Sequence, residues 1–188
     1  MKKLFLAILI FHFSLLTVNC EAQDKRLLDS LETQLKNHNA KKRELQIKSL
    51  SLFDSTAAII LYELSRAYWG NNPDTGIYYA NQCLALSEQI GFKKGTGTAY
   101  SSMGVNEGRK GNYLLALEFH KKAVKIFEEI GYKKGISASY SNIGLIYEEQ
   151  DNYPEALKNY FAALKIAEEQ RDKIGIANCY SNSGVVYK

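Results

Sequence analysis

Hydrophobic and small residues recur along the chain with a spacing that predicts paired helices. From residue 140 onward, one helical face carries two aromatic residues, an apolar residue and a glycine, at Tyr140, Ile143, Gly144 and Tyr147. Positions three and four residues apart share a face at 3.6 residues per turn. A polar turn over 150–152 follows, and a second apolar face then runs through Ala156, Leu157, Tyr160, Ala163 and Leu164. The pattern predicts two helices joined by a short turn.

This pattern returns with a period of 40 residues, which is marked by Gly95, Gly135 and Gly175. The preceding copy has Glu107 and His120 where aromatic residues are expected, but keeps Tyr100, Met103, Gly104, Ala116 and Ala123. An earlier, divergent copy has a shorter turn and contains Leu61, Leu64, Ser65, Tyr68, Gly76 and Cys83. A last copy contributes a first helix with Tyr180 and Gly184. Because one helix pair of this size cannot bury its apolar stripe alone, the copies are expected to stack.

Small residues and turn residues support the same interpretation. One position of the first helix is glycine in the three later copies, at Gly104, Gly144 and Gly184, and one position of the second is alanine, at Ala116 and Ala156. Small side chains at these places are expected to let the paired helices approach closely. Asn152 can cap the second helix together with Glu155, three residues later. Gly131 suits a left-handed helix C-terminus.

The first residues of the chain have a different character. Two lysines precede an apolar run of about 15 residues, which is short for a bilayer span of about 20. This pattern is typical of a secretory signal peptide, and residues 1–22 are predicted to be removed by cleavage after Ala22. Lipidation at Cys20 is the alternative. In both cases the protein is expected to be exported, and to be periplasmic or secreted.

Residues 23–54 are predicted to form an N-terminal lead-in helical segment. Four leucines lie on one helical face of it, at Leu27, Leu28, Leu31 and Leu35. An apolar face of this kind is expected to cover the exposed edge of the first repeat.

Composition and charge narrow the possible functions. The 188-residue chain is 46% hydrophobic and 23% charged, which suits a folded core. Its formal net charge of +4 is spread without a basic block, which argues against nucleic-acid binding. We find no glycine-rich phosphate loop, no metal-like His/Cys spacing and no Ser/His/Asp set, so neither enzymatic activity nor a cofactor is expected. Cys83 and Cys179 are more than two repeats apart, so buried thiols are expected rather than a disulfide.

The repeat resembles the tetratricopeptide repeat in a long, 40-residue variant. The residues that carry the resemblance in the best-preserved copy are Tyr140, Ile143, Gly144, Tyr147, Ala156, Tyr160 and Ala163. The resemblance implies an all-α fold, a right-handed superhelical solenoid of antiparallel helix hairpins. It divides the chain into a divergent first repeat (55–93), a second repeat (94–133), a third repeat (134–173) and the first helix of a truncated fourth repeat (174–188).

The resemblance also implies a binding function. In this family the concave face, lined mainly by the first helices, usually binds an extended or helical peptide. The positions carried over to that face are Tyr62, Arg66, Trp69, Ser101, Val105, Arg109, Ser141, Asn142, Leu145, Ser181, Asn182 and Val185. The predicted partner is therefore a protein or peptide, without nucleic acid or a small-molecule cofactor.

Two settings for this function remain open. The first is a complete binding scaffold outside the cytoplasm. The second is the sensory segment of a longer protein, because the leader, the leucine helix and the repeats together resemble the extracytoplasmic sensory region of bacterial (Bacteroidetes-like) membrane histidine kinases and transcription regulators. Residues 185–187 are patterned to pack against a further helix. A longer parent protein, or self-association through the uncapped C-terminal helix, is therefore expected.

Overall fold

The structure, a computed structural model, describes residues 25–41 and 51–186, without the side chains of 51–53 and 185–186. The predicted signal peptide (1–22), Cys20 and the side chain of Val185 lie outside the described residues. Throughout the described ranges the secondary structure is helical, with no strand. A helix over 25–41 is followed by α2 (Ser51–Ala67), α3 (Pro73–Gln89), α4 (Lys93–Arg109), α5 (Tyr113–Glu129), α6 (Lys133–Glu148), α7 (Tyr153–Glu169) and α8 (Lys173–Val186).

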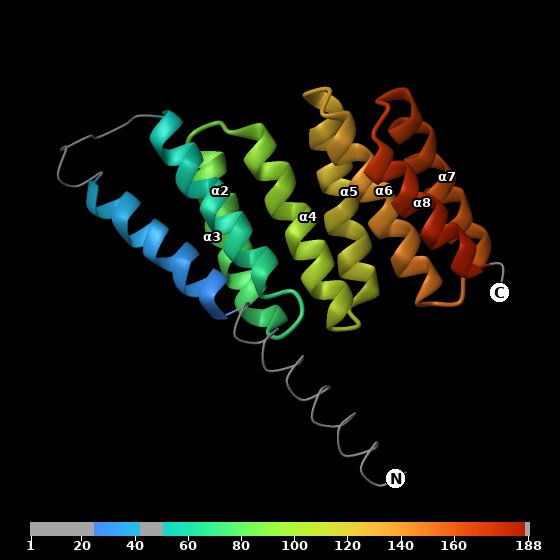
Figure 1. Ribbon diagram of the computed structural model, residues 1–188, viewed down its shortest axis with the longest axis horizontal. Helices are drawn as coiled ribbons and strands as arrows, with labels where there is room; N and C mark the ends of the chain where they lie inside the picture. Colours follow the sequence, from blue (N-terminus) through green and yellow to red (C-terminus); the bar gives the residue numbers. More distant parts are fainter. Residues whose placement is uncertain (1–24, 42–50, 187–188) are drawn as a thin grey trace, which may run out of the picture.

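Consecutive helices pack side by side in chain order (Figure 1). Three hairpins, α2–α3, α4–α5 and α6–α7, are followed by α8. The first helices of successive hairpins also contact one another, whereas α3, α5 and α7 do not. When only one row of helices touches from repeat to repeat, the array curves with that row on its inner side. The predicted all-α, right-handed solenoid of antiparallel hairpins is confirmed, and the first helices α2, α4, α6 and α8 form its concave face.

The 40-residue spacing is also present in the helix boundaries. The first helices α4, α6 and α8 begin at residues 93, 133 and 173, and the second helices α3, α5 and α7 begin at 73, 113 and 153. The divergent first repeat departs from this spacing, because α2 begins at Ser51, inside the segment predicted as the lead-in (23–54). The boundary between lead-in and first repeat therefore lies earlier than predicted.

The helix over 25–41 lies beside α2 and α3 (Figure 1). The Tyr79 hydroxyl donates a hydrogen bond to Glu32 Oε1 at 3.3 Å, and Leu35 packs against a core cluster formed by Ala58, Leu61, Cys83 and Ala99. Leu28 and Leu31 are also partly buried, but Leu27 is 53% exposed. The helix covers the first repeat as predicted, with a narrower leucine face that excludes Leu27.

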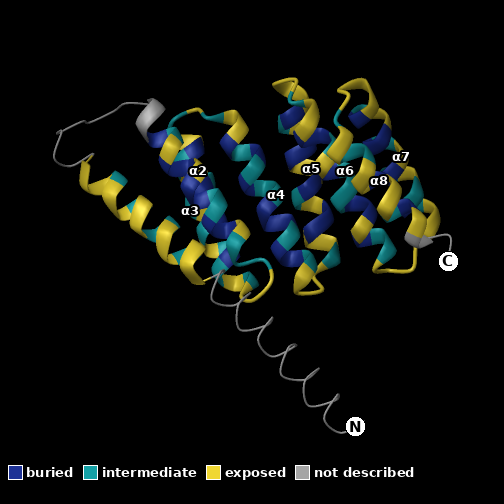
Figure 2. Ribbon diagram, in the orientation of Figure 1, coloured by how far each residue is buried: buried dark blue, intermediate teal, exposed yellow. Residues whose placement is uncertain are grey.

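The glycine of the first helix lets the paired second helix approach closely. A Cβ atom added to Gly144 would lie 2.5 Å from Cε1 of Tyr160, and one added to Gly104 would lie 2.7 Å from Nε2 of His120. Both rings are buried, and Figure 2 shows buried residues along the faces on which the helices meet. The nearest partner of Gly144 is thus the Tyr160 ring and not Ala156.

Most predicted repeat positions are part of this packing. Seven of them are buried, namely Gly104, Ala116, Ala123, Gly144, Ala156, Tyr160 and Ala163, and three are half-buried, namely Tyr100, Tyr140 and Tyr147. On α8, by contrast, Tyr180 is 60% exposed and an added Cβ at Gly184 would have nothing within 4 Å. These two positions therefore do not pack as their counterparts do in the earlier repeats.

Two glycine-to-alanine substitutions are expected to change stability in opposite directions. Gly144→Ala presses a methyl group against the Tyr160 ring, and this overpacking should lower the free energy of unfolding by about 1–3 kcal/mol. An alanine at position 108 makes ordinary contacts, 3.8 Å from Ala116 Cβ and 3.9 Å from Ile146 Cγ1. Gly108→Ala should therefore raise the free energy of unfolding by about 0.5–1 kcal/mol through helix propensity. Urea denaturation of both variants checks the signs, and a stabilised Gly144→Ala would contradict the packing described above.

Each helix from α3 to α7 ends in the same hydrogen-bonded turn. At the end of α5, Tyr132 N–H donates to Phe127 O at 2.8 Å and Gly131 N–H donates to Glu128 O at 3.1 Å. This is a Schellman motif, which places its central residue in the left-handed region. Gly131 has φ +66°, as predicted, but the matching positions after α6 and α7 are Asp151 at φ 55° and Arg171 at φ 53°. At the start of α7, the Asn152 half of the predicted cap is confirmed, because Asn152 Oδ1 accepts from Glu155 N–H at 3.4 Å. The predicted return bond is not formed, since the Glu155 carboxylate accepts from Lys158 and the Asn152 N–H donates to Tyr147 O.

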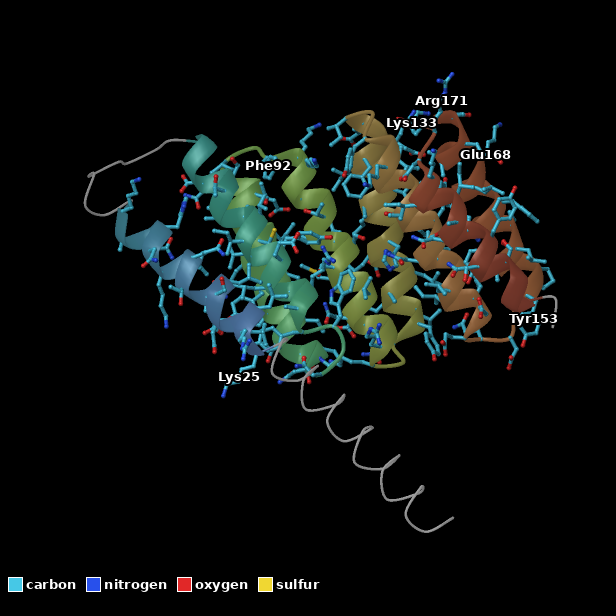
Figure 3. All side chains as sticks on the ribbon, in the orientation of Figure 1. Lys25, Phe92, Lys133, Tyr153, Glu168 and Arg171 are labelled. Carbon is cyan, nitrogen blue, oxygen red and sulfur yellow. The ribbon has the colours of Figure 1, made fainter. Side chains whose placement is uncertain are left out.

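Arg171→Gly is expected to stabilise the protein. The residue is exposed at the edge of the array (Figure 3), so its side chain contributes little packing, while its left-handed backbone is strained for any residue with a Cβ. Glycine should relieve this strain and raise the free energy of unfolding by about 0.5–1 kcal/mol. Thermal unfolding checks this prediction, with the reverse change Gly131→Arg as the matched variant. A higher Tm for Gly131→Arg would refute it.

Candidate functional site

A groove of about 660 Å³ opens between the first helices α4 and α6. From α4 it is lined by Gly104, Val105, Gly108 and Arg109, and from α6 by Asn142, Leu145 and Ile146. Four of the predicted binding residues, Val105, Arg109, Asn142 and Leu145, therefore meet around one space. Helical periodicity explains their convergence, since Val105 and Arg109 are one turn apart on α4 and Asn142 and Leu145 are one turn apart on α6.

The rim of the groove combines apolar surface with charges of both signs. Leu145 is 40% exposed. Arg109 is exposed and has no ion pair within the described part of the chain. Beside it, Lys110 Nζ lies 2.6 Å from Asp74 Oδ1, and this hydrogen bond raises the pKa of Lys110. Glu149, also exposed, lines the groove from the end of α6. A peptide with apolar and charged side chains would find a partner for each here.

His120 of α5 also lines the groove. Its side chain is 1% exposed, and Nδ1 is buried without a hydrogen-bond partner. Burial lowers the pKa of His120 to about 4, so the imidazole is neutral at pH 7. A neutral imidazole has one donor and one acceptor nitrogen. His120 therefore contributes a neutral aromatic ring to the groove, with one ring nitrogen that no described residue hydrogen-bonds.

Trp69, predicted as a binding residue, takes part in a polar network between α2 and α4. Its indole N–H donates to Ser102 Oγ at 3.2 Å, and the Ser102 and Ser65 hydroxyls lie 2.5 Å apart. Ser65 Oγ in turn donates to Gly76 O at 2.7 Å. The amide of Asn106, which is completely buried, donates to Ser102 O at 2.8 Å. Trp69 is thus engaged within the fold.

The other predicted binding residues lie outside the α4–α6 groove. Tyr62 is half-buried against the core cluster that contains Cys83. Arg66 Nη1 lies 3.2 Å from Glu63 Oε2 in an ion pair. Ser141 Oγ lies 3.8 Å from Cys179 Sγ. Three more are half-buried or exposed on the first helices α4 and α8, namely Ser101, Ser181 and Asn182. The structure therefore concentrates the candidate site on the second and third repeats.

Several groove residues are missing from the predicted binding set, and the three that the site depends on most are Gly108, His120 and Ile146. The signal for His120 in the sequence is that it replaces the aromatic residue found as Tyr160 in the next repeat. The signal for Gly108 is a glycine where the neighbouring repeats have Trp69 and Glu148. Departures from the repeat pattern therefore mark this site better than the pattern itself.

Outside the groove, the described residues show no metal-binding cluster and no reactive thiol. Within residues 25–41 and 51–186 no three His, Cys, Asp or Glu side chains are placed to hold a metal ion. In these ranges, no helix has the length and apolar character required to cross a membrane. Cys83 and Cys179 are free and buried, as predicted. Burial raises the pKa of Cys83 to about 11, which keeps this thiol protonated and unreactive at neutral pH.

Comparison with known proteins agrees with the fold. Residues 135–188 match a family model described as tetratricopeptide repeat. No curated protein shows a significant match to the sequence. Among solved structures, BtubC (BKLC) from P. vanneervenii has a TM-score of 0.70 at 16% identity, over 87% of this chain and 65% of that chain. The apo form of RapI has a TM-score of 0.65 at 20% identity, over 84% of this chain and 44% of that chain.

A third similar structure is a signal transduction ATPase with numerous domains from Pyrococcus horikoshii, a protein with a tetratricopeptide repeat sensor. Its TM-score is 0.60 at 23% identity, over 77% of this chain and 22% of that chain. The present chain spans less than two thirds of each of these three proteins, and at such identities the likeness concerns the fold alone. The tetratricopeptide repeat model thus covers residues 135–188, and the similar structures extend the likeness of fold over the rest of the array.

Proposed function

We propose that this chain is a non-enzymatic scaffold that binds a protein or peptide segment in the groove between α4 and α6. Tetratricopeptide proteins generally bind protein or peptide partners, and the fold is consistent with an interaction scaffold. The observation that carries the proposal is the convergence of Val105, Arg109, Asn142 and Leu145 around one groove.

The chemistry of these four side chains suits an extended peptide. The Asn142 amide can both donate to and accept from a peptide backbone. Val105 and Leu145 offer apolar contact to a side chain, and the guanidinium of Arg109 can pair with a carboxylate. A mixed groove of this kind orients a ligand without requiring a reactive group from the protein.

A random-peptide phage library selected on the purified protein tests this function. Peptides that bind the wild-type protein should bind Leu145→Glu at least about tenfold more weakly, because a charge replaces apolar contact surface in the groove. Leu114→Glu is the matched control, since Leu114 is 83% exposed on α5 outside the groove, and it should bind as the wild type does. Selection of no peptide, or equal binding to both variants, would refute the proposal.

We place this function outside the cytoplasm, on the basis of the apolar leader over residues 1–22. Mass spectrometry of the protein from an exporting bacterial host should give an N-terminus at Gln23, or a lipid-modified Cys20 in the alternative. An uncleaved leader would contradict the proposed location.

The second candidate is the sensory segment of a histidine kinase or transcription regulator. It is supported by the resemblance of the leader, the leucine helix and the repeats together to such regions. The Pyrococcus horikoshii ATPase, which has a tetratricopeptide repeat sensor, gives an example of this fold in a longer signalling protein. Sequencing downstream of the Lys188 codon separates the two candidates, because only the sensory segment requires a membrane span and an output domain there.

A further inference from the structure

The first helices meet at three junctions, α2–α4, α4–α6 and α6–α8, and these junctions differ in the residue at one repeat position. At the α2–α4 junction, that position is Trp69, which donates a hydrogen bond to Ser102 across the junction. One repeat further on, Trp69 and Ser102 correspond to Gly108 and Asn142. In the following repeat the same position is Glu148, whose carboxylate accepts a 2.5 Å hydrogen bond from a tyrosine hydroxyl. Of these three positions, only Gly108 has no side chain, and the 660 Å³ groove lies beside it.

The contacts of Gly108 support this correspondence. A Cβ atom on Gly108 would lie 3.9 Å from Cγ1 of Ile146. Ile146 corresponds to Asn106, which in the preceding junction hydrogen-bonds Ser102, the residue bound by Trp69. A side chain at position 108 would therefore extend into the same inter-repeat space that Trp69 occupies. The groove therefore corresponds to the space that the Trp69 indole fills in the preceding junction, and that Gly108 leaves open in this one.

Two polar side chains line this space without a hydrogen bond to any described residue. Asn142 stands where Ser102 accepts the indole N–H of Trp69, and its amide oxygen can accept in the same way. His120 lines the groove, is 1% exposed, and has a buried Nδ1 without a partner. A ligand that covers the Asn142 amide without bonding it leaves a polar group buried and unpaired, which is unfavourable, so a ligand that supplies a hydrogen bond there gains affinity. An aliphatic or phenyl side chain would fill the volume and leave this amide unpaired.

We infer that the groove binds the side chain of a tryptophan or tyrosine in the partner peptide, in the place that Trp69 takes in the preceding junction. The inference rests on the proposed function and specifies its ligand. The ring fills the space beside Gly108 and lies next to the His120 ring, and the indole N–H or phenol O–H donates to the amide oxygen of Asn142. Arg109 and Leu145 at the rim contact the residues on either side.

Titration of the full-length 15N-labelled protein with pentapeptides tests this inference. The probes are Ac-Gly-Ala-X-Ala-Gly-NH2 with tryptophan, tyrosine, phenylalanine or leucine as X, and free N-acetyltryptophanamide. Tryptophan and tyrosine peptides should bind about tenfold more tightly than the phenylalanine and leucine peptides, as one added hydrogen bond predicts. They should also bind more tightly than N-acetyltryptophanamide, because the flanking residues contribute.

Two variants make the test specific. Gly108→Trp fills the groove from within and should abolish binding of the tryptophan peptide, while Leu114→Trp adds the same residue on an exposed part of α5 and should leave binding unchanged. Asn142→Leu removes the acceptor, keeps a side chain of similar size, and should reduce the preference for tryptophan over phenylalanine.

Equal binding of all pentapeptides, no binding of any, or binding unaffected by Gly108→Trp would overturn the inference. Library-selected peptides that lose affinity for Leu145→Glu but not for Gly108→Trp would also overturn it, while leaving the proposed binding function intact. Equal affinity for N-acetyltryptophanamide and the tryptophan peptide would point to a free aromatic metabolite, and would likewise contradict a peptide ligand.

Discussion

Tyr160→Ala is expected to lower the free energy of unfolding by about 3–5 kcal/mol. The side chain is completely buried, and its ring lies against Gly144 of the paired helix. Its hydroxyl also donates a 2.5 Å hydrogen bond to Glu148 on that helix. Truncation to alanine therefore removes a buried ring and a hydrogen bond between α6 and α7, and leaves a cavity that the backbone of Gly144 cannot fill.

Tyr160→Phe separates the two contributions. It retains the ring and removes only the hydrogen bond, so it should cost about 0.5–1.5 kcal/mol, or somewhat more because the acceptor is a carboxylate. Urea denaturation of both variants, with m-values compared, provides the measurement. A cost for Tyr160→Ala no greater than that for Tyr160→Phe would show that ring packing against Gly144 does not hold the hairpin together.

Acidification from pH 7 to pH 4 should remove on the order of 3 kcal/mol of stability through His120 alone. Burial lowers the pKa of this imidazole to about 4 in the folded protein, against an ordinary value of 6.5. Between these two values the unfolded chain takes up a proton that the folded chain does not. The contribution is therefore fully present above pH 6.5, falls as the pH drops towards 4, and is constant below that.

His120→Phe isolates this effect from that of the carboxylates. Stability of the wild type and the variant is measured by urea denaturation at several pH values between 4 and 7. The difference between the two should shift in favour of the variant as the pH falls. Parallel pH profiles, or an NMR titration that places the pKa of His120 near 6.5, would contradict the burial described for this side chain.

The repeat architecture could be predicted because each repeat position has one packing role. Gly144 permits the approach of a ring, Tyr160 supplies that ring, and both recur at helical spacing within a fixed period. A periodic sequence fixes a periodic structure when each copy buries the same face against its neighbour. The left-handed residue that ends α5 could be predicted in the same way, because Gly131 is a residue type that suits this position. Arg171 adopts the same left-handed backbone, and its residue type gave no signal for this, because residues with a Cβ atom rarely adopt that conformation.

The candidate site was only partly predictable for a related physical reason. Carrying positions over from one repeat to the next assumes that equivalent residues have equivalent surroundings. The assumption fails at Trp69, because its indole is hydrogen-bonded to Ser102 and is not available to a ligand. It also fails at the equivalent Gly108, which has no side chain and therefore leaves a groove open. Residues such as Val105 and Leu145 were identified because the resemblance carries them over to the concave face of the first helices. The depth of the groove between them depends on a missing side chain, which periodicity does not reveal.

The most direct measurement is an NMR map of the bound state. A library-selected peptide is added to the 15N-labelled protein, and the backbone amide shifts are followed to saturation. Binding in the groove predicts that the largest changes cluster at Val105, Arg109, Asn142 and Leu145, with smaller ones on α2 and α8. Changes confined to the outer faces of α3, α5 and α7 would contradict the assignment of the concave α4–α6 groove as the binding site.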